Sequence, residues 1–157
     1  MEKLIIKSAL AIISVAILFF SVFSFACTDF TGSYEGSLSP SDSPGTMTVI
    51  QTLTQDQCLS LTIETKIPTP NGNLTVNKQT YQLDGSSQEF YPRVSAVTTL
   101  KDQTLTIIIT EQNEITKTVS TDTEIMNLDA QNNLVLDDHK VDAFGNVSQS
   151  SSIFVRQ

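Results

Sequence analysis

The sequence predicts an all-β fold, an antiparallel meander of about eight or nine strands that closes as an up-and-down barrel, with a β-sandwich as the alternative. Apolar residues alternate with Thr, Ser and Gln, turn signals recur at nearly regular spacing, and no segment has helical periodicity. The clearest run is Thr104–Glu111, in which Leu105, Ile107 and Ile109 share one face and most residues are β-branched. Similar runs lie on both sides of it, so we expect this strand in the middle of the meander.

The N-terminus carries the features of a secretory leader. A short basic start precedes the apolar stretch Ser8–Phe25, and Ser24 and Ala26 are the small residues that signal peptidase requires before its cut. We therefore predict a signal peptide at residues 1–26 and a single all-β domain at residues 27–157. The alternative is an uncleaved N-terminal membrane anchor, since the apolar stretch is long enough to span a bilayer.

Charge and composition limit the partners of the domain. The formal net charge is −8 and the acidic residues are scattered along the chain. An acidic surface of this kind disfavours nucleic acid and anionic lipid as partners. The sequence has no Trp, so the core has to be built mainly from Leu, Ile and Val.

The two cysteines are expected to pair. If Phe30–Gly36, Thr46–Thr54 and Leu59–Ile67 are the first three strands, the first and third strands start at the same end of the sheet. Cys27 precedes the first of these strands and Cys58 precedes the third. In an exported protein we therefore predict a disulfide between them.

Lipidation is the alternative fate of Cys27, because a cysteine directly after a leader resembles the bacterial lipobox. Ala26 fits that pattern, but Ser24 stands where the pattern has Leu, Val or Ile. Lipidation would tether the protein to a membrane surface. It excludes the disulfide because both modifications consume Cys27, and the incomplete lipobox favours the disulfide.

The remaining strands are predicted from the same alternation. We expect them at Leu74–Leu83, Arg93–Leu100, Thr104–Glu111, Ile115–Leu128 as one bent strand, Asn133–Val141 and Ser151–Arg156. A bulge is expected between Val76 and Tyr81, where the alternation changes phase. Turns and loops are expected at Leu38–Gly45, Pro68–Asn73, Asp84–Ser87, Ala130–Asn133 and Phe144–Asn146.

Two short motifs resemble those of small lipocalin-like (calycin) barrels. The first predicted strand carries Gly32-Ser33-Tyr34, and Arg156 lies close to the end of the chain. Lipocalins have Gly-x-Trp on the first strand and a late Arg that packs over the Trp. Here Tyr34 stands where the family has Trp, and Arg156 corresponds to the Arg. The resemblance implies an up-and-down barrel with a ligand cavity.

Candidate site residues are few. Tyr34, Tyr81, Phe90 and Tyr91 are the candidate ligand-binding residues; packing or turn covering is the competing role for the last three. His139 is the only histidine and follows Asp137 and Asp138, but a lasting transition-metal site usually needs more nitrogen or sulfur ligands. No Gly-x-Ser-x-Gly elbow occurs. We therefore expect no catalytic site, no metal and no cofactor.

These observations favour an exported, non-enzymatic barrel that binds a small apolar ligand in the periplasm or outside the cell. The alternative is an envelope protein-interaction or inhibitor module that presents the Pro68–Asn73 turn and the Ser39–Gly45 loop, with an anchor through a lipidated Cys27 as a further option. Membrane association is expected only if Cys27 is lipidated or the leader stays uncleaved. An enzyme that uses His139 and Asp138 is the least favoured class.

Overall fold

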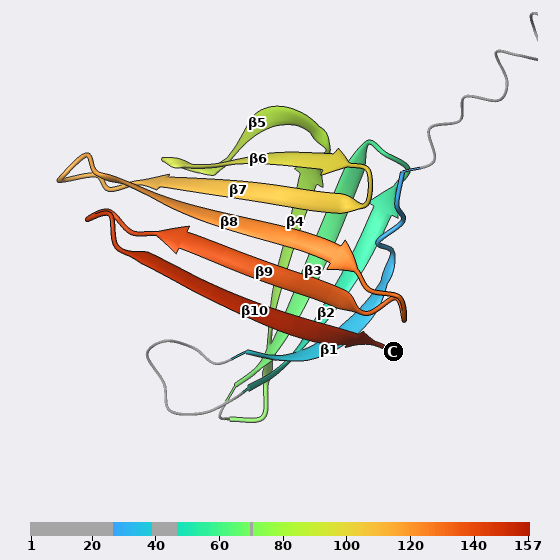
Figure 1. Ribbon diagram of the computed structural model, residues 1–157. Coiled ribbons are helices and arrows are strands. Elements are labelled where there is room, and N and C mark those ends of the chain that lie inside the picture. Colours follow the sequence, from blue (N-terminus) through green and yellow to red (C-terminus); the bar gives the residue numbers. More distant parts are fainter. Residues whose placement is uncertain (1–26, 39–46, 70) are drawn as a thin grey trace, which may run out of the picture.

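A computed structural model of the protein describes residues 27–38, 47–69 and 71–157 (Figure 1). These ranges contain ten β-strands and no helix. The strands are β1 (Gly32–Leu38), β2 (Met47–Asp56), β3 (Ser60–Pro68), β4 (Leu74–Gln82), β5 (Asp84–Tyr91), β6 (Val94–Lys101), β7 (Thr104–Gln112), β8 (Val119–Leu128), β9 (Leu134–Val141) and β10 (Val147–Arg156). The predicted signal peptide and the predicted Ser39–Gly45 loop lie outside the described residues.

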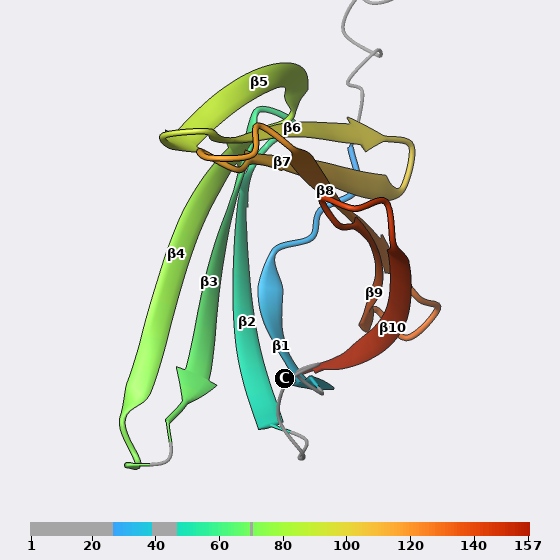
Figure 2. The ribbon, with the colours of Figure 1, turned by 90° about the vertical axis from the view of Figure 1, so that its left-hand side faces the viewer.

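All ten strands belong to one antiparallel sheet, in the order β4-β3-β2-β1-β10-β9-β8-β7-β6-β5. Strands that follow each other in the chain are neighbours in the sheet, except that β1 pairs with β10 and that β4 and β5 are the two edges. The sheet curls so that β2, β3 and β4 lie opposite β8, β9 and β10 (Figure 2). The result is a nearly closed up-and-down barrel, which confirms the predicted fold class.

Side chains bridge the seam between the two edge strands. The rings of Tyr81 on β4 and Phe90 on β5 meet edge to face, with centroids 5.3 Å apart. The backbone N–H of Gln82 donates to Oε1 of Gln88 at 2.7 Å. Because β4 and β5 do not pair directly in the sheet, these contacts hold the edges together near the end of the barrel where β4 runs into β5.

The fifth strand corrects one prediction. We expected a turn at Asp84–Ser87, but β5 runs through it. This strand pairs only with β6, and the pairing contains register shifts between Asp84 and Ser87 and between Glu89 and Tyr91. At an edge with a single partner, β5 can be almost entirely polar, so its alternation has too little hydrophobic contrast to be read from the sequence.

The bulge predicted in the fourth strand is wrong. The pairing between β3 and β4 has no register shift, from the pair of Pro68 with Leu74 at one end to the pair of Ser60 with Gln82 at the other. Val76 and Tyr81 lie on opposite faces of a regular strand, because Val76 is 54% exposed and Tyr81 only 8%. The apparent change of phase came from assuming that every apolar residue faces inward.

Two strands begin at other residues than predicted, and β7 is not the central strand of the sheet. The eighth strand begins at Val119 rather than at Ile115, because Oδ1 of Asn113 accepts the backbone N–H groups of Ile115 and Thr116 and closes a hairpin turn. The tenth strand begins at Val147 rather than at Ser151, because its serine-rich half pairs fully with β9. β7 is paired on both sides, but the centre of the sheet order falls at β10 and β9.

The N-terminal segment covers one end of the barrel, which we call the closed end. Phe30 is fully buried there, and the hydroxyl of Thr28 donates to the carbonyl oxygen of Asp102 in the β6–β7 turn at 3.1 Å. Nε2 of Gln55 donates to the carbonyl oxygens of Thr28 at 3.0 Å and Gln57 at 2.6 Å. These bonds tie the segment to the end of β2 and to the far side of the barrel.

The predicted disulfide is present between Cys27 and Cys58. It joins the start of the covering segment to the β2–β3 turn, the arrangement expected from the shared end of the first and third strands. Disulfides persist in oxidising environments, so this bond indicates a non-cytoplasmic compartment.

The contact predicted from the lipocalin-like motif is confirmed. Cζ of Arg156 lies 5.8 Å from the centroid of the Tyr34 ring, and Nη2 of Arg156 donates to the carbonyl oxygen of Thr31 at 2.8 Å. Tyr34 is fully buried and its hydroxyl donates to the carbonyl oxygen of Phe30 at 3.0 Å. The last strand is thereby locked onto the first where the barrel closes.

Gly36 leaves the room that Phe154 fills at this junction. A Cβ atom at Gly36 would overlap the buried Phe154 ring. We therefore expect Gly36→Ala to lower the free energy of unfolding by about 1–3 kcal/mol, the usual cost of overpacking. Urea unfolding followed by circular dichroism measures it. The neighbouring Ser37 is exposed, so Ser37→Ala is the matched control, expected within about 0.5 kcal/mol of the wild type; equal stability of the two variants would contradict the packing argument.

Candidate ligand-binding site

The inner face of strands β6–β10 is built in cross-strand rows that change character along the barrel. The two rows nearest the closed end are almost wholly apolar. They are Leu128–Leu134–Phe154 and Leu100–Leu105–Met126–Leu136–Ser152. Most of these side chains are buried, so this end of the barrel is filled by packing.

The next two rows are polar on β8, β9 and β10. They are Thr98–Ile107–Glu124–Asp138–Ser150 and Ala96–Ile109–Asp122–Lys140–Ser148. Glu124 and Asp138 face each other directly, and Asp122 is the next inward residue along β8. An acidic cluster of three carboxyl groups, Asp122, Glu124 and Asp138, therefore lines the inner face beyond the apolar rows.

Water reaches this half of the barrel, which we call the open half. Asp122, Glu124 and Asp138 are partly accessible, and the inward-facing Lys140 and Ser150 are exposed. Inward-facing side chains of a fully packed barrel would be buried. Ile107, which lies in the same row as Glu124, is buried in this way. The open half therefore leaves part of its inner face uncovered.

The acidic cluster shifts the pKa values of its own members. Burial, followed by the charges of Asp122 and Asp138, raises the pKa of Glu124 to about 7. Burial and then Asp138 raise the pKa of Asp122 to about 6, while Lys140 acts in the opposite direction. Nearby negative charges and burial both disfavour the ionised forms of Glu124 and Asp122.

Several buried polar atoms in the barrel have no hydrogen-bond partner among the described residues. They are Oε1 of Gln51, Oγ1 of Thr98, Oδ1 of Asp122 and Oδ1 of Asp138. Buried polar atoms are satisfied in the large majority of cases, so unsatisfied ones need an explanation. Two of the four belong to the acidic cluster, and Thr98 lies in the same row as Glu124 and Asp138.

The four candidate ligand residues from the sequence do not form one site. Tyr34 belongs to the closed end. Tyr81 and Phe90 pack together on the inner side of the β4–β5 seam, and the charge of Glu124 helps to raise the Tyr81 pKa to about 12, after burial. Tyr91 is 63% exposed beside the β5–β6 turn. Only Tyr81 and Phe90 are brought together, and Tyr81 lies within electrostatic reach of the acidic cluster.

The acidic cluster was missed from the sequence, although a signal was there. Asp122 and Glu124 are an even number of positions from the buried Met126 and therefore lie on the same face of the strand. The same is true of Asp138 relative to the buried Leu134 and Leu136. Acidic residues at inward positions of a strand are unusual, because unpaired charges are costly to bury. Such positions are candidates for a binding site.

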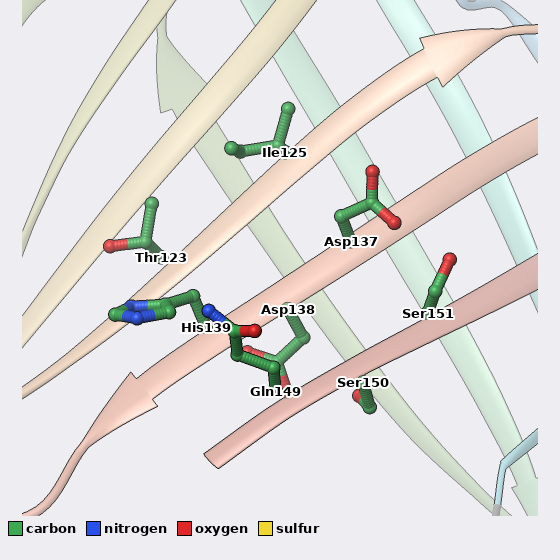
Figure 3. Close-up of a pocket in the computed structure, with 8 residues that line it drawn as sticks. All are labelled: Thr123, Ile125, Asp137, Asp138, His139, Gln149, Ser150 and Ser151. Carbon is green, nitrogen blue, oxygen red and sulfur yellow. The ribbon is translucent and has the colours of Figure 1, made fainter. Parts of the chain in front are cut away.

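A hollow of about 660 Å³ lies along the outer face of β8, β9 and β10 (Figure 3). Thr123, Ile125, Asp137, His139, Gln149 and Ser151 line it, and so do Asp138 and Ser150, whose positions alternate with these along β9 and β10. Asp137 and His139 share this face, as expected for one strand. Within the described ranges, no group of three His, Cys, Asp or Glu side chains is placed to hold a metal ion.

A search for membrane-spanning helices among the described residues finds none that is long and apolar enough.

Comparisons with known proteins agree with the geometry. No family model and no curated protein matches the sequence. Among solved structures, the fold is similar to that of the fluorescent protein UnaG. An asparagine-to-alanine variant of UnaG is 15% identical with a TM-score of 0.56, covering 82% of this chain and 96% of UnaG. An asparagine-to-glutamine variant is 16% identical with a TM-score of 0.57, covering 81% and 95%. The chain therefore has a lipocalin-like, calycin β-barrel fold.

Proposed function

We propose that this protein is an exported, non-enzymatic barrel that binds a small, largely apolar ligand in its open half. The observation that carries the proposal is that inward-facing positions there remain accessible to water. Partly buried apolar side chains adjoin this space, namely Ile109 on β7 and Phe90 on β5. Small barrels of this architecture commonly hold one small ligand inside. The disulfide agrees with a periplasmic or extracellular location.

A polarity-sensitive neutral dye tests the proposal. Nile red is expected to bind saturably and to gain fluorescence. The adjacent Ser150 and Ser151 are both exposed but lie on opposite faces of β10, so they provide matched blocking variants. We expect Ser150→Trp, which enters the open half, to weaken dye binding at least about tenfold, and Ser151→Trp to leave it unchanged.

Other results of this experiment would contradict the proposal. If Ser151→Trp blocks the dye and Ser150→Trp does not, the ligand binds in the outer hollow of Figure 3. If the wild type does not bind the dye at all, the barrel is not a carrier of apolar ligands.

One observation favours a protein-interaction module as the second candidate function. Ile115 and Phe144 are 90% and 89% exposed, and each lies at the tip of a hairpin turn. Exposed large apolar side chains on neighbouring hairpins are typical of contact surfaces. The double variant Ile115→Asn, Phe144→Asn is expected to release a partner that the wild type retains from an envelope extract; retention of the same partner by both proteins would exclude these tips.

A further inference from the structure

We propose that the ligand of the open half carries a cationic, hydrogen-bond-donating head, a protonated primary amine, received by Asp122, Glu124 and Asp138. This inference rests on the proposed function and names the chemical class of its ligand.

The charge of the site is uncompensated. Three carboxyl groups face the interior in two adjacent rows, while the inward-facing cation of these rows is Lys140. Lys140 is opposite Asp122 but exposed, and it does not take part in either of the two ion pairs found in the described residues, Lys66–Glu64 and Arg93–Glu114. A positive group from outside the chain would balance the remaining negative charge.

The unsatisfied atoms of the cluster are hydrogen-bond acceptors, so they too favour a cationic donor. Oδ1 of Asp122 and Oδ1 of Asp138 are buried and accept no hydrogen bond from any described residue. Ionised carboxylates only accept, so the cluster needs donors, and an ammonium group offers three of them. Asp122 and Asp138 lie close enough for one carboxyl, when protonated, to donate to the other.

A second, independent observation comes from neutral side chains. Thr98 is 1% exposed and Gln51 is 8% exposed, and each has a buried side-chain oxygen that no described residue contacts by a hydrogen bond. Thr98 faces inward in the row of Glu124 and Asp138, two strands from Glu124. Both oxygens can accept from donors of a bound molecule, so the unsatisfied groups of the barrel are not limited to acids.

The surroundings favour an amine attached to an apolar body. The partly buried Ile109 lies beside Asp122 in the cross-strand rows. An alkyl chain can cover this side chain while its head reaches the carboxyl groups. A fatty acid of the same length would place a negative head against three carboxyl groups, so we expect the barrel to discriminate by the sign of the head.

Three ligands of equal chain length test this discrimination, namely octylamine, octanol and octanoate. Each competes with Nile red at pH 8, where an alkylamine is protonated, since its pKa resembles the value of about 10.4 for lysine. We expect octylamine to bind at least about tenfold more tightly than octanol, and octanoate more weakly than octanol.

Matched variants assign the effect to the acidic cluster. Glu124→Gln and Asp138→Asn are each expected to weaken octylamine binding about tenfold and to leave octanol binding unchanged. Asp137→Asn, which removes a carboxyl group from the outer face of the same strand, is the control and is expected to change neither. Lys140→Met, which removes the competing inward cation, is expected to strengthen octylamine binding.

The pH dependence provides another readout. The ionisable groups near Glu124 are Tyr81 from β4, Asp122 from its own strand and Asp138 from β9, while Lys140 from β9 faces Asp122. Because raised pKa values let Glu124 and Asp122 gain protons below neutral pH, octylamine affinity is expected to fall between about pH 8 and about pH 5, while octanol affinity stays constant.

The outcomes separate the two proposals. Equal affinities for the amine and the alcohol, or loss of amine binding in Asp137→Asn alone, would overturn the cationic-head proposal while leaving a carrier of apolar ligands. Failure of Nile red to bind the wild type would overturn the proposed function itself. Preference for octanoate would also refute the cationic head, because a carboxylate head binds to a positively charged site.

Discussion

Without a ligand, the protein is expected to lose stability as the pH rises from about 5 to about 8, the reverse of ordinary acid denaturation. The pKa of Glu124 is raised from 4.5 to about 7 in the folded protein. The folded state therefore holds this proton more tightly than the unfolded state. The resulting stabilisation is complete below the unfolded value and is lost as the pH rises through the folded one. At about 1.4 kcal/mol per tenfold change, the loss is about 3 kcal/mol.

Asp122 adds to the same trend, but by less, because water screens its more accessible carboxyl group. Carboxyl groups with lowered pKa values act in the opposite direction. Asp84, Asp129 and Asp142 accept hydrogen bonds from residues two to four positions later in the chain, and stabilisation from such groups is lost only as the pH falls to about 4 and below. The interval above pH 5 therefore isolates the acidic cluster.

Urea unfolding at three pH values checks this expectation. The wild-type free energy of unfolding should fall by about 3 kcal/mol from pH 5 to pH 8. Glu124→Gln should flatten the curve and be the more stable protein at pH 8, whereas the exposed Glu35→Gln should follow the wild type. A wild-type stability that stays level or rises over this interval would show that the buried carboxyl groups are already compensated.

Removal of the disulfide is the second change with a large expected effect. Cys27 and Cys58 are separated by 31 positions, and the chain-entropy model assigns a closed loop of this size about 3–4 kcal/mol. Loss of the bond also frees the segment that carries Phe30 across the closed end. We therefore expect the double variant Cys27→Ser, Cys58→Ser to lose about 3–4 kcal/mol of unfolding free energy relative to the oxidised wild type.

Two comparisons make this test specific. Wild type unfolded in reductant should match the double variant, since both lack the bond. Gln55→Ala keeps the disulfide but removes the hydrogen bonds to Thr28 and Gln57, so it measures how much of the loss comes from the covering segment. An unchanged urea midpoint in the double variant would mean that the bond contributes nothing to the fold.

The mature protein from its native host also answers the question of lipidation. A mass two hydrogens below that of reduced residues 27–157 is expected for the disulfide-bonded form. A mass increased by acyl chains, with a free thiol at Cys58, would instead show a lipoprotein anchored through Cys27.

Much of this architecture was determined by the sequence itself. Local alternation is enough to identify a half-buried strand such as β3 or β7, because one face meets the core and the other meets water. Cys27 and Cys58 could be paired in advance because the order of antiparallel strands decides which ends meet. Arg156 over Tyr34 followed from a short motif at each end of the chain.

The tertiary structure alone decided the rest, because it depends on contacts between distant strands. The edge strand β5 forms because β6 offers it a partner, which no local pattern records. Closure as a barrel depends on the pairing of β1 with β10. The candidate site arises in the same way. The alternation along each strand already assigns Asp122, Glu124 and Asp138 to the inner face, but only the register of β8 with β9, together with the curvature of the sheet, brings them together as one cluster.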